Sequence, residues 1–358
     1  MNRYQIFDKA HELMVELNIH ELPVNPFAVA DQLNIPIVSY KEASEMGYAG
    51  LVENVLRGKA EADAFCCRIN GHYIIFYDEK RTPPNRINFT IAHEIGHIRL
   101  DHFQQDGYYT RYQLNKKGDF KEREADSFAG ELLRPPVLLA LAGITRNSDI
   151  RLCCNVTTSA ANAARKAIAR IIDFLYIGRI ALTTAFFEKQ FSEFLHTYYC
   201  RSCNAIFYHH TDDFHCPICG SMNITHKFVL NEGGLKSIMH YPCQPTFPGT
   251  NTISTCLRCG NDEINPNDNF CPICGAPLAN KCYGRRKYDN SYEEEYWDEN
   301  ESCGRGLQAN ARFCPDCGCE SLFFKEEMLE PWHVESQKLK TTIDEKIPFG
   351  FSVKKAAP

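Results

Sequence analysis

The first half of the chain alternates between segments with helical and with strand-like hydrophobic spacing. Apolar residues recur every three or four positions in four segments: 3–18, 88–100, 121–135 and 157–175. Three shorter apolar runs have the composition of strands: 35–40, 64–69 and 72–77. Asn70-Gly71 separates the last two runs and predicts a β-hairpin. The pattern therefore predicts an α+β domain in which helices pack on a small sheet.

The segment 88–100, NFTIAHEIGHIRL, places polar side chains inside an apolar helix. His93 and His97 are four residues apart, so their imidazoles lie on one helix face and can bind the same metal ion. Glu94 lies beside them, within reach of a metal-bound water. This H-E-x-x-H motif predicts a catalytic zinc site with its own general base. Gly96 costs about 1 kcal/mol in a helix interior, which makes sense if another element packs tightly against it.

The helix predicted over 121–135, KEREADSFAGELLRP, supplies the expected third zinc ligand. Its buried face is apolar and consists of Ala125, Phe128, Ala129, Leu132 and Leu133. Glu122 projects near the middle of that face, whereas Glu124 projects away from it and is expected in solvent. Asp126 lies one turn after Glu122 on the same face. Its carboxylate can accept the free ring N–H of a ligand histidine, which fixes the orientation of the imidazole.

The sequence predicts the positions of other polar residues in this half less specifically. His102 lies about 140° from the ligand stripe on a straight helix, so we expect it behind the ligands or at the surface. We expect His11 and His20 at the surface. A polar loop over 103–118 contains Tyr108, Tyr109 and Tyr112. Any of these hydroxyls would suit an oxyanion donor, although a solvent-facing ring is the expectation for each one.

FTIAHEIGHIRLDH followed by EREADSFAGELLRP resembles the ImmA/IrrE family of metallo-endopeptidases, over roughly residues 5–175. The order of Glu122 and Asp126 after H-E-x-x-H is also similar to the wider thermolysin-like group. In that group the glutamate is the third zinc ligand and the aspartate orients the first histidine. The resemblance implies a compact zincin-like domain. It also implies a protein substrate, a helix-turn-helix transcriptional repressor of a mobile element or stress regulon.

Composition narrows the classes of function. The 358 residues are 44% hydrophobic and 23% charged, which is typical of a folded soluble chain. The net charge of −6 gives no overall attraction to nucleic acid. No apolar run reaches the roughly 18 residues of a membrane span, and the N-terminus lacks the apolar core of a signal peptide. We therefore expect a cytoplasmic protein without a membrane partner.

Most of the 18 cysteines lie beyond residue 199, and most of these form C-x-x-C pairs next to glycine or proline. In a reducing compartment such pairs bind metal rather than form disulfides. Two sets predict zinc ribbons, each with a closed tetrahedral thiolate site. The ligands of the first are Cys200, Cys203, Cys216 and Cys219. Those of the second are Cys256, Cys259, Cys271 and Cys274.

A third ribbon follows from an internal repeat. NFCPICG at 269–275 recurs as RFCPDCG at 312–318, which supplies Cys314 and Cys317. Cys303 and Cys282 complete the predicted site, and Cys319 is the alternative to Cys282. The acidic insert between Cys282 and Cys303 is expected to be a solvated loop.

These features predict seven parts: a zinc metallopeptidase domain over 1–178, a connecting helix over 179–199, ribbon 1 over 200–220, a linker over 221–255, ribbon 2 over 256–275, ribbon 3 over 276–320 and a tail over 321–358. One catalytic and two or three structural zinc ions are expected. Structural zinc would supply folding energy that such small units lack. Because the ribbons have few clustered basic residues, they favour a protein partner over nucleic acid.

Our main hypothesis is a zinc-dependent endopeptidase that hydrolyses a peptide bond in a protein substrate. The alternative is a non-catalytic regulatory protein that acts through its ribbons by binding a protein or, less readily, DNA. A protein that reads nucleic acid through its ribbons would bind in a salt-dependent manner, which the net charge of −6 disfavours.

Overall fold

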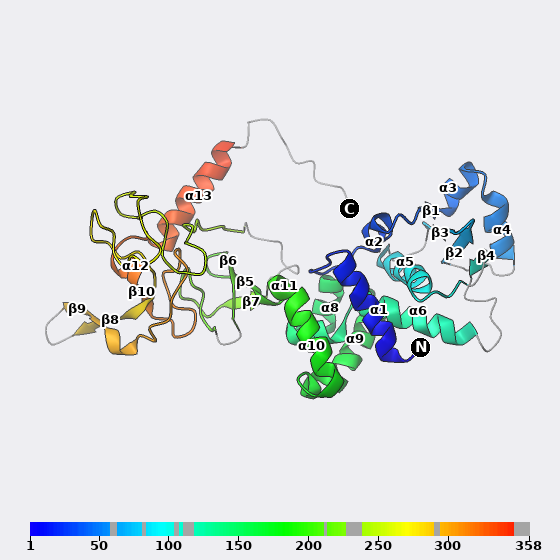
Figure 1. The fold of residues 1–358 in the computed structure, drawn as a ribbon, viewed down its shortest axis with the longest axis horizontal. Coiled ribbons are helices and arrows are strands. Elements are labelled where there is room, and N and C mark those ends of the chain that lie inside the picture. Colours follow the sequence, from blue (N-terminus) through cyan, green and yellow to red (C-terminus); the bar gives the residue numbers. More distant parts are fainter. Residues whose placement is uncertain are drawn as a thin grey trace. The chain divides into compact units, whose positions relative to one another are not determined.

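The computed structural model describes residues 1–57, 63–80, 84–103, 107–109, 118–210, 213–226, 238–289 and 294–346. The chain forms two compact units, Met1–Leu195 and His196–Pro358 (Figure 1). Each unit is described separately. Both units combine helices with small sheets, and the second contains cysteine-rich β modules. The fold is therefore α+β, as the sequence predicts.

A four-stranded sheet with the order β1-β3-β2-β4 lies in unit 1. Its strands are β1 (Ile37–Ser39), β2 (Ala64–Ile69), β3 (His72–Tyr77) and β4 (Gly107–Tyr109). The hairpin prediction is confirmed, because Ile69 pairs with His72 across Asn70 and Gly71, which both have positive φ. β1 runs parallel to β3. β4 pairs with β2 within a segment predicted to be loop only, so that prediction is wrong for residues 107–109.

Helices provide the rest of unit 1. They are α1 (Arg3–Glu16), α2 (Pro26–Gln32), α3 (Tyr40–Glu45), α4 (Ala49–Arg57), α5 (Pro84–Arg99), α6 (Gly118–Leu133), α7 (Pro136–Leu141), α8 (Asn147–Cys154), α9 (Thr158–Ile171), α10 (Gly178–Gln190) and α11 (Ser192–His196), which ends one residue into unit 2. α6 packs against both α5 and α1, and α10 packs against α7. His20 is exposed as expected. The prediction for His11 is wrong, because its ring is buried between α1 and α6 with Nε2 2.9 Å from Glu131 Oε1.

The contact between α5 and α6 is very close at Gly96. A Cβ atom at this position would lie 3.1 Å from the Phe128 ring and 3.2 Å from the carbonyl oxygen of Ala125. The small side chains of Ala125 and Ala129 are fully buried on the facing side of α6. Glycine at position 96 therefore lets the two backbones approach so closely that a methyl group there would have to push its neighbours aside by a few tenths of an ångström.

The described residues of unit 2 form two three-stranded sheets. One has the order β6-β5-β7, with β5 (Thr197–Cys200), β6 (Ile206–Tyr208) and β7 (Ile224–His226). The other has the order β10-β8-β9, with β8 (Cys282–Asp289), β9 (Glu294–Asp298) and β10 (Glu320–Ser321). The short helix α12 (Leu322–Lys325) and the longer α13 (Trp332–Lys346) follow.

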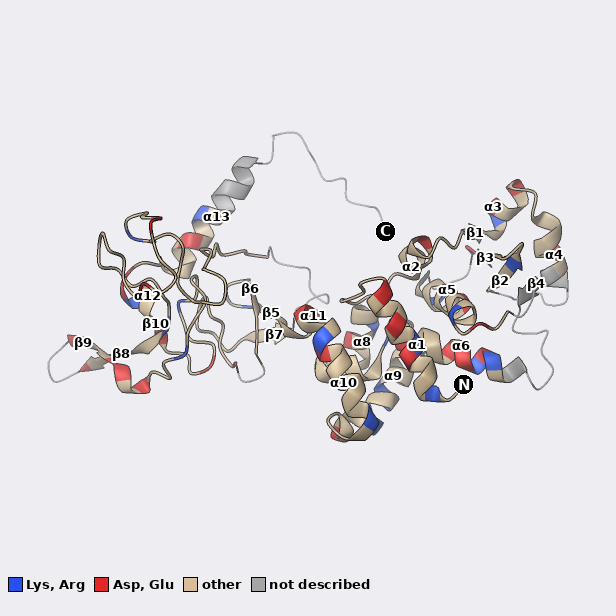
Figure 2. Cartoon of the chain, viewed as in Figure 1, with Lys and Arg blue, Asp and Glu red and all other residues tan. Residues whose placement is uncertain are grey.

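The acidic insert is a β-hairpin, so the prediction of a solvated loop is wrong. β8 and β9 pair in antiparallel register from Arg285 to Asp289. Lys287 Nζ lies 2.6 Å from Asp298 and 2.7 Å from Glu301, and Arg285 lies 2.6 Å from Glu301. The basic triplet 285–287 is therefore paired with carboxylates of the same module, and Figure 2 shows acidic residues along β9 in red. A nucleic-acid phosphate would have to compete with these carboxylates for the same cations.

Among the described residues, every helix is too short or too polar to traverse a lipid bilayer.

We predict that Gly96→Ala destabilises unit 1 relative to Gly50→Ala. Both substitutions add the same methyl group to a helix, but nothing lies within 4 Å of a Cβ at Gly50. Overpacking against the α6 backbone should cost about 1–3 kcal/mol, against a gain of up to about 1 kcal/mol in helix propensity. Hydrogen exchange of the α5 amides measures the difference. Equal protection in both variants would contradict the tight contact.

Candidate metal centre

Three buried side chains from two helices converge in unit 1. α5 carries His93 and His97 one turn apart, and α6 carries Glu122 opposite them. Their ligand atoms lie within 4.8 Å of one another. The Nε2 atoms of the histidines are 3.1 Å apart, and each lies 3.3 Å from an oxygen of Glu122. Tetrahedral zinc with bonds of about 2.0–2.1 Å separates its ligand atoms by roughly 3.3 Å, so this donor set fits zinc.

The charges of the three groups depend on one another. Burial raises the pKa of Glu122, but hydrogen bonds from the two histidines outweigh it and lower that pKa to about 2. Burial lowers the pKa of His93, but hydrogen bonds to Asp126 and Glu122 outweigh it and raise that pKa to about 10. A metal ion at this place competes with a proton for His93, so its affinity falls as the pH falls.

Glu94 lies beside the triad and is only 6% exposed. Burial raises the pKa of its carboxyl group, and a hydrogen bond from the backbone N–H of Cys66 on β2 works against that rise. Its Oε2 atom is buried without a hydrogen-bond partner within the described part of the chain. A buried carboxylate oxygen in this situation is unfavourable unless another group, such as a water molecule, contacts it. A raised pKa also suits a residue that takes and returns a proton near neutral pH.

Asp126 contacts the outer side of His93. Its Oδ1 atom lies 2.9 Å from Nδ1 of His93. A carboxylate at Nδ1 keeps the proton on that nitrogen and leaves the lone pair of Nε2 for a metal ion. The structure thus brings Asp126 to the place expected for it, one turn after Glu122 on α6.

His102 lies behind His97, one of the two places expected for it, and forms with Glu124 a second chain of hydrogen bonds. Nδ1 of His102 lies 2.9 Å from Nδ1 of His97, and Nε2 of His102 lies 3.0 Å from Oε2 of Glu124. Burial and the neighbouring His97 lower the pKa of His102 to about 4. A neutral His102 therefore accepts the Nδ1 proton of His97 and donates its own to Glu124. The prediction that Glu124 lies in solvent is wrong, because it is only 6% exposed.

The turn after α5 explains the position of His102. The helix ends at Arg99, and Asp101 has a left-handed φ of 53°. The backbone N–H of His102 donates to the carbonyl of His97, which is the hydrogen bond of a Schellman turn. This turn folds His102 back under His97, whereas a straight helix would direct it away. Aspartate tolerates the left-handed region better than most residues, and that was the available sequence signal.

Two adjoining hollows share Arg134 and Ala163, and each includes one residue that neighbours His93 but none of the triad itself. The larger has a volume of about 690 Å³ and is lined by Phe89, Arg86, Arg134, Arg151 and the first turn of α9. The Phe89 ring centroid lies 6.5 Å from that of His93. The smaller has a volume of about 390 Å³, and Asp126 and Arg134 are among its lining residues.

Arg134 lines both hollows and is the cation there that best indicates what could bind. Its Nε atom is buried without a hydrogen-bond partner among the described residues, whereas Arg86 is paired with Asp63 at 2.7 Å. Burial lowers the pKa of the Arg134 guanidinium. A carboxylate entering the larger hollow would satisfy this cation.

The tyrosines proposed as oxyanion donors are not placed by this structure. Tyr112 lies outside the described residues, and of Tyr108 and Tyr109 only the backbone, in β4, is described.

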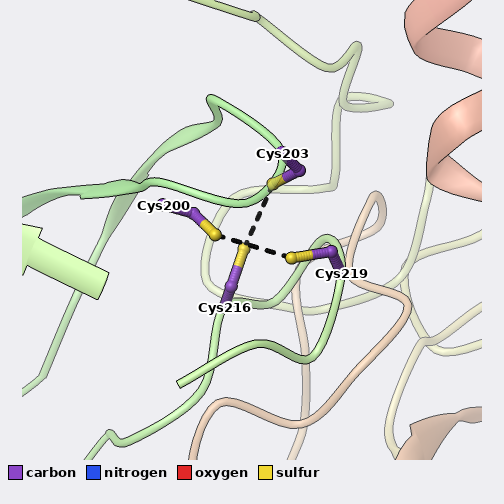
Figure 3. A group of neighbouring side chains, drawn as sticks. All are labelled: Cys200, Cys203, Cys216 and Cys219. Atoms are coloured by element: carbon purple, nitrogen blue, oxygen red, sulfur yellow. Dashed lines mark hydrogen bonds between the residues drawn. The ribbon is translucent and has the colours of Figure 1, made fainter. Parts of the chain in front are cut away.

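Twelve cysteines of unit 2 form three groups of four, and none of them forms a disulfide. The groups are Cys200, Cys203, Cys216 and Cys219; Cys256, Cys259, Cys271 and Cys274; and Cys282, Cys303, Cys314 and Cys317. In the first, the four sulfur atoms point toward a common centre (Figure 3). Neighbouring sulfur atoms are 3.5–3.7 Å apart in the three groups. Zinc–sulfur bonds of about 2.3 Å in a tetrahedron imply about 3.8 Å, so each group fits zinc.

The same backbone turn shapes each C-x-x-C knuckle and separates Cys319 from the third group. In four knuckles, the N–H of the glycine after the second cysteine donates to the carbonyl of the first. These glycines have φ values of 71–74°. The N–H of the first cysteine then donates to the residue after the glycine. In the third ribbon that residue is Cys319, whose carbonyl accepts from Cys314 at 2.7 Å. Cys319 Sγ instead contacts the carbonyl of Glu301 at 3.2 Å.

We predict that His102→Leu weakens zinc binding at the His93–His97–Glu122 site about 10–100-fold, because removal of an outer hydrogen-bond partner has this effect on metal sites. Asp126→Ala should weaken it similarly, and His20→Leu, at an exposed histidine, is the control. Competition with a chelator measures the affinity, while cobalt–thiolate absorption follows the ribbon sites separately. Unchanged affinity in His102→Leu would show that the contact with His97 is only structural.

A second prediction distinguishes Cys282 from Cys319. Cys282→Ser should remove one zinc ion per chain, since it breaks a tetrad, whereas Cys319→Ser should leave the zinc content unchanged. Native mass spectrometry counts the bound ions. The opposite result would make Cys319 the ligand.

A comparison with known protein families finds a match within the first unit. Residues 49–163 match the family model Peptidase_M78, the IrrE N-terminal-like domain. The match runs from the start of α4 into α9 and includes His93, Glu94, His97, Glu122 and Asp126. A search of curated proteins found no match. The chain thus carries an IrrE N-terminal-like, zinc metallopeptidase-like domain, followed by cysteine clusters compatible with zinc ribbons.

Proposed function

We propose that this protein is a zinc-dependent endopeptidase whose catalytic ion is bound by His93, His97 and Glu122. The observation that carries the proposal is the buried triad beside Glu94, whose Oε2 atom has no hydrogen-bond partner within the described residues. A structural zinc site needs four protein ligands, whereas a catalytic site keeps one position open. Three protein ligands and an adjacent carboxylate match the catalytic type.

The residues of the site have distinct roles in this proposal. A zinc ion held there supplies a Lewis acid that lowers the pKa of water and polarises the scissile carbonyl group. Glu94 takes the proton from the attacking water and returns it to the leaving amine. Asp126 holds His93, and Glu124 holds His97 through His102. These contacts fix both imidazoles before the substrate binds.

The proposed substrate is a protein, in particular a helix-turn-helix repressor of a mobile element or stress regulon. The match to the peptidase family supports a protein substrate, and the resemblance of the motifs supports the repressor. The hollow lined by Arg86, Arg134 and Arg151 suits a segment that carries an acidic side chain near the cleaved bond. The ribbons, with one structural zinc ion each, would bind a protein partner.

We predict that Glu94→Gln lowers the rate of cleavage by about 10²–10⁴-fold while zinc stays bound, because the amide cannot accept the proton of water. Candidate repressors are incubated with the zinc-loaded protein, and the fragments are identified by mass spectrometry. Enrichment of acidic residues near the cleaved bonds tests the arginine-lined hollow. Equal cleavage by the wild type and by Glu94→Gln would reject the mechanism.

A further inference from the structure

One heptapeptide pattern occurs three times in unit 2. A C-P-x-C-G knuckle is preceded by two residues, of which the second is aromatic, at 214–220, 269–275 and 312–318. We call these the first, second and third knuckles. Each contributes two cysteines to a different tetrad. Their shared sequence suggests that they present the same surface.

The first and third knuckles bind each other reciprocally. The carbonyl of Pro217 in the first accepts hydrogen bonds from the N–H groups of Arg312 and Phe313 in the third, at 2.8 and 3.0 Å. The carbonyl of Pro315 in the third accepts hydrogen bonds from Phe214 and His215 in the first, at 2.7 and 2.9 Å. Each knuckle thus gives two N–H groups and one carbonyl to the same positions of the other. A local twofold symmetry therefore relates the two knuckles.

The aromatic residues follow the same relation. The ring of Phe313 lies against Gly220, 3.0 Å from the position that a Cβ would take. The ring of His215 lies against Gly318, 2.7 Å from the corresponding position. The glycine of each knuckle therefore leaves room for the ring of the other.

The second knuckle has the same groups but no such partner. Phe270 is 64% exposed and Ile273 is 73% exposed. Nothing lies within 4 Å of a Cβ at Gly275. Within the described residues, the N–H groups of Asn269 and Phe270 and the carbonyl of Pro272 make no hydrogen bond. Every group that pairs the first knuckle with the third is thus present and exposed in the second.

We propose that the second knuckle pairs with the second knuckle of another copy of this chain. The internal pair shows that the pattern binds its own kind through a twofold arrangement, and twofold contacts are the commonest route to homodimers. In the dimer, the ring of Phe270 lies on Gly275 of the second copy. The carbonyl of Pro272 accepts from the N–H groups of its residues 269 and 270. A contact of this size is smaller than a permanent interface, so the dimer is weak and reversible.

Sedimentation velocity of the zinc-loaded full chain over a wide range of concentration tests the proposal. The wild type should shift toward a dimer as concentration rises, and Phe270→Asp should weaken the association at least about tenfold, since it removes the central aromatic contact. The matched control is Phe174→Asp, which changes another exposed phenylalanine, 51% exposed and outside the three knuckles. This control should sediment like the wild type.

Two further measurements remove ambiguity. The zinc content of Phe270→Asp should equal that of the wild type, because Phe270 is exposed and is not a ligand; if it does not, Ile273→Asp serves as the second variant. Hydrogen exchange at Asn269 and Phe270 should slow as concentration rises. A wild-type protein that stays monomeric, or a dimer that is unaffected by both variants, overturns the proposal.

Discussion

The metal centre depends on how closely α5 approaches α6. The histidines lie on one helix and Glu122 on the other, and a carboxylate side chain reaches an imidazole only if the two backbones nearly touch. Gly96 faces the backbone of Ala125 and makes this approach possible. A glycine within a helix costs about 1 kcal/mol, and the close approach that the site requires explains why glycine stands here. The same contact buries the triad, so one interaction determines both position and environment.

Burial imposes a second condition, because polar groups removed from water need partners. α6 supplies partners for both imidazoles. Asp126 contacts His93 directly, and Glu124 contacts His102, which in turn contacts His97. His93 is therefore tied to α6 directly, and His97 is tied to it through His102 in the turn after α5. Within the described residues, Oε2 of Glu94 has no hydrogen-bond partner, which fits the role of general base that we propose for it.

The sequence predicts features that depend on local spacing. The i, i+4 histidines, the placing of Glu122 and Asp126 on one face of α6, the Asn-Gly hairpin and the first two cysteine tetrads all follow from short-range spacing. The third tetrad follows from the repeat of the C-P-x-C-G pattern. The buried position of Glu124 could not be predicted in this way. The sequence of α6 shows a single apolar stripe, but the turn after α5 covers a second side of the helix. That turn depends on one left-handed residue, Asp101. The pairing of β8 with β9 also escaped prediction, since cross-strand ion pairs resemble a solvated charged loop when only composition is considered.

The reciprocal pairing of the first and third knuckles has a consequence for the synthesis of the chain. The two partners are about 100 residues apart, so the first knuckle leaves the ribosome well before the residues that cover it. Unit 1 is complete by then and can fold on its own schedule, since domains generally fold as units during translation. The contact between the two knuckles in unit 2 forms only after residues 312–318 have emerged. During that interval Pro217 and Gly220 of the first knuckle lack the partners that later cover them.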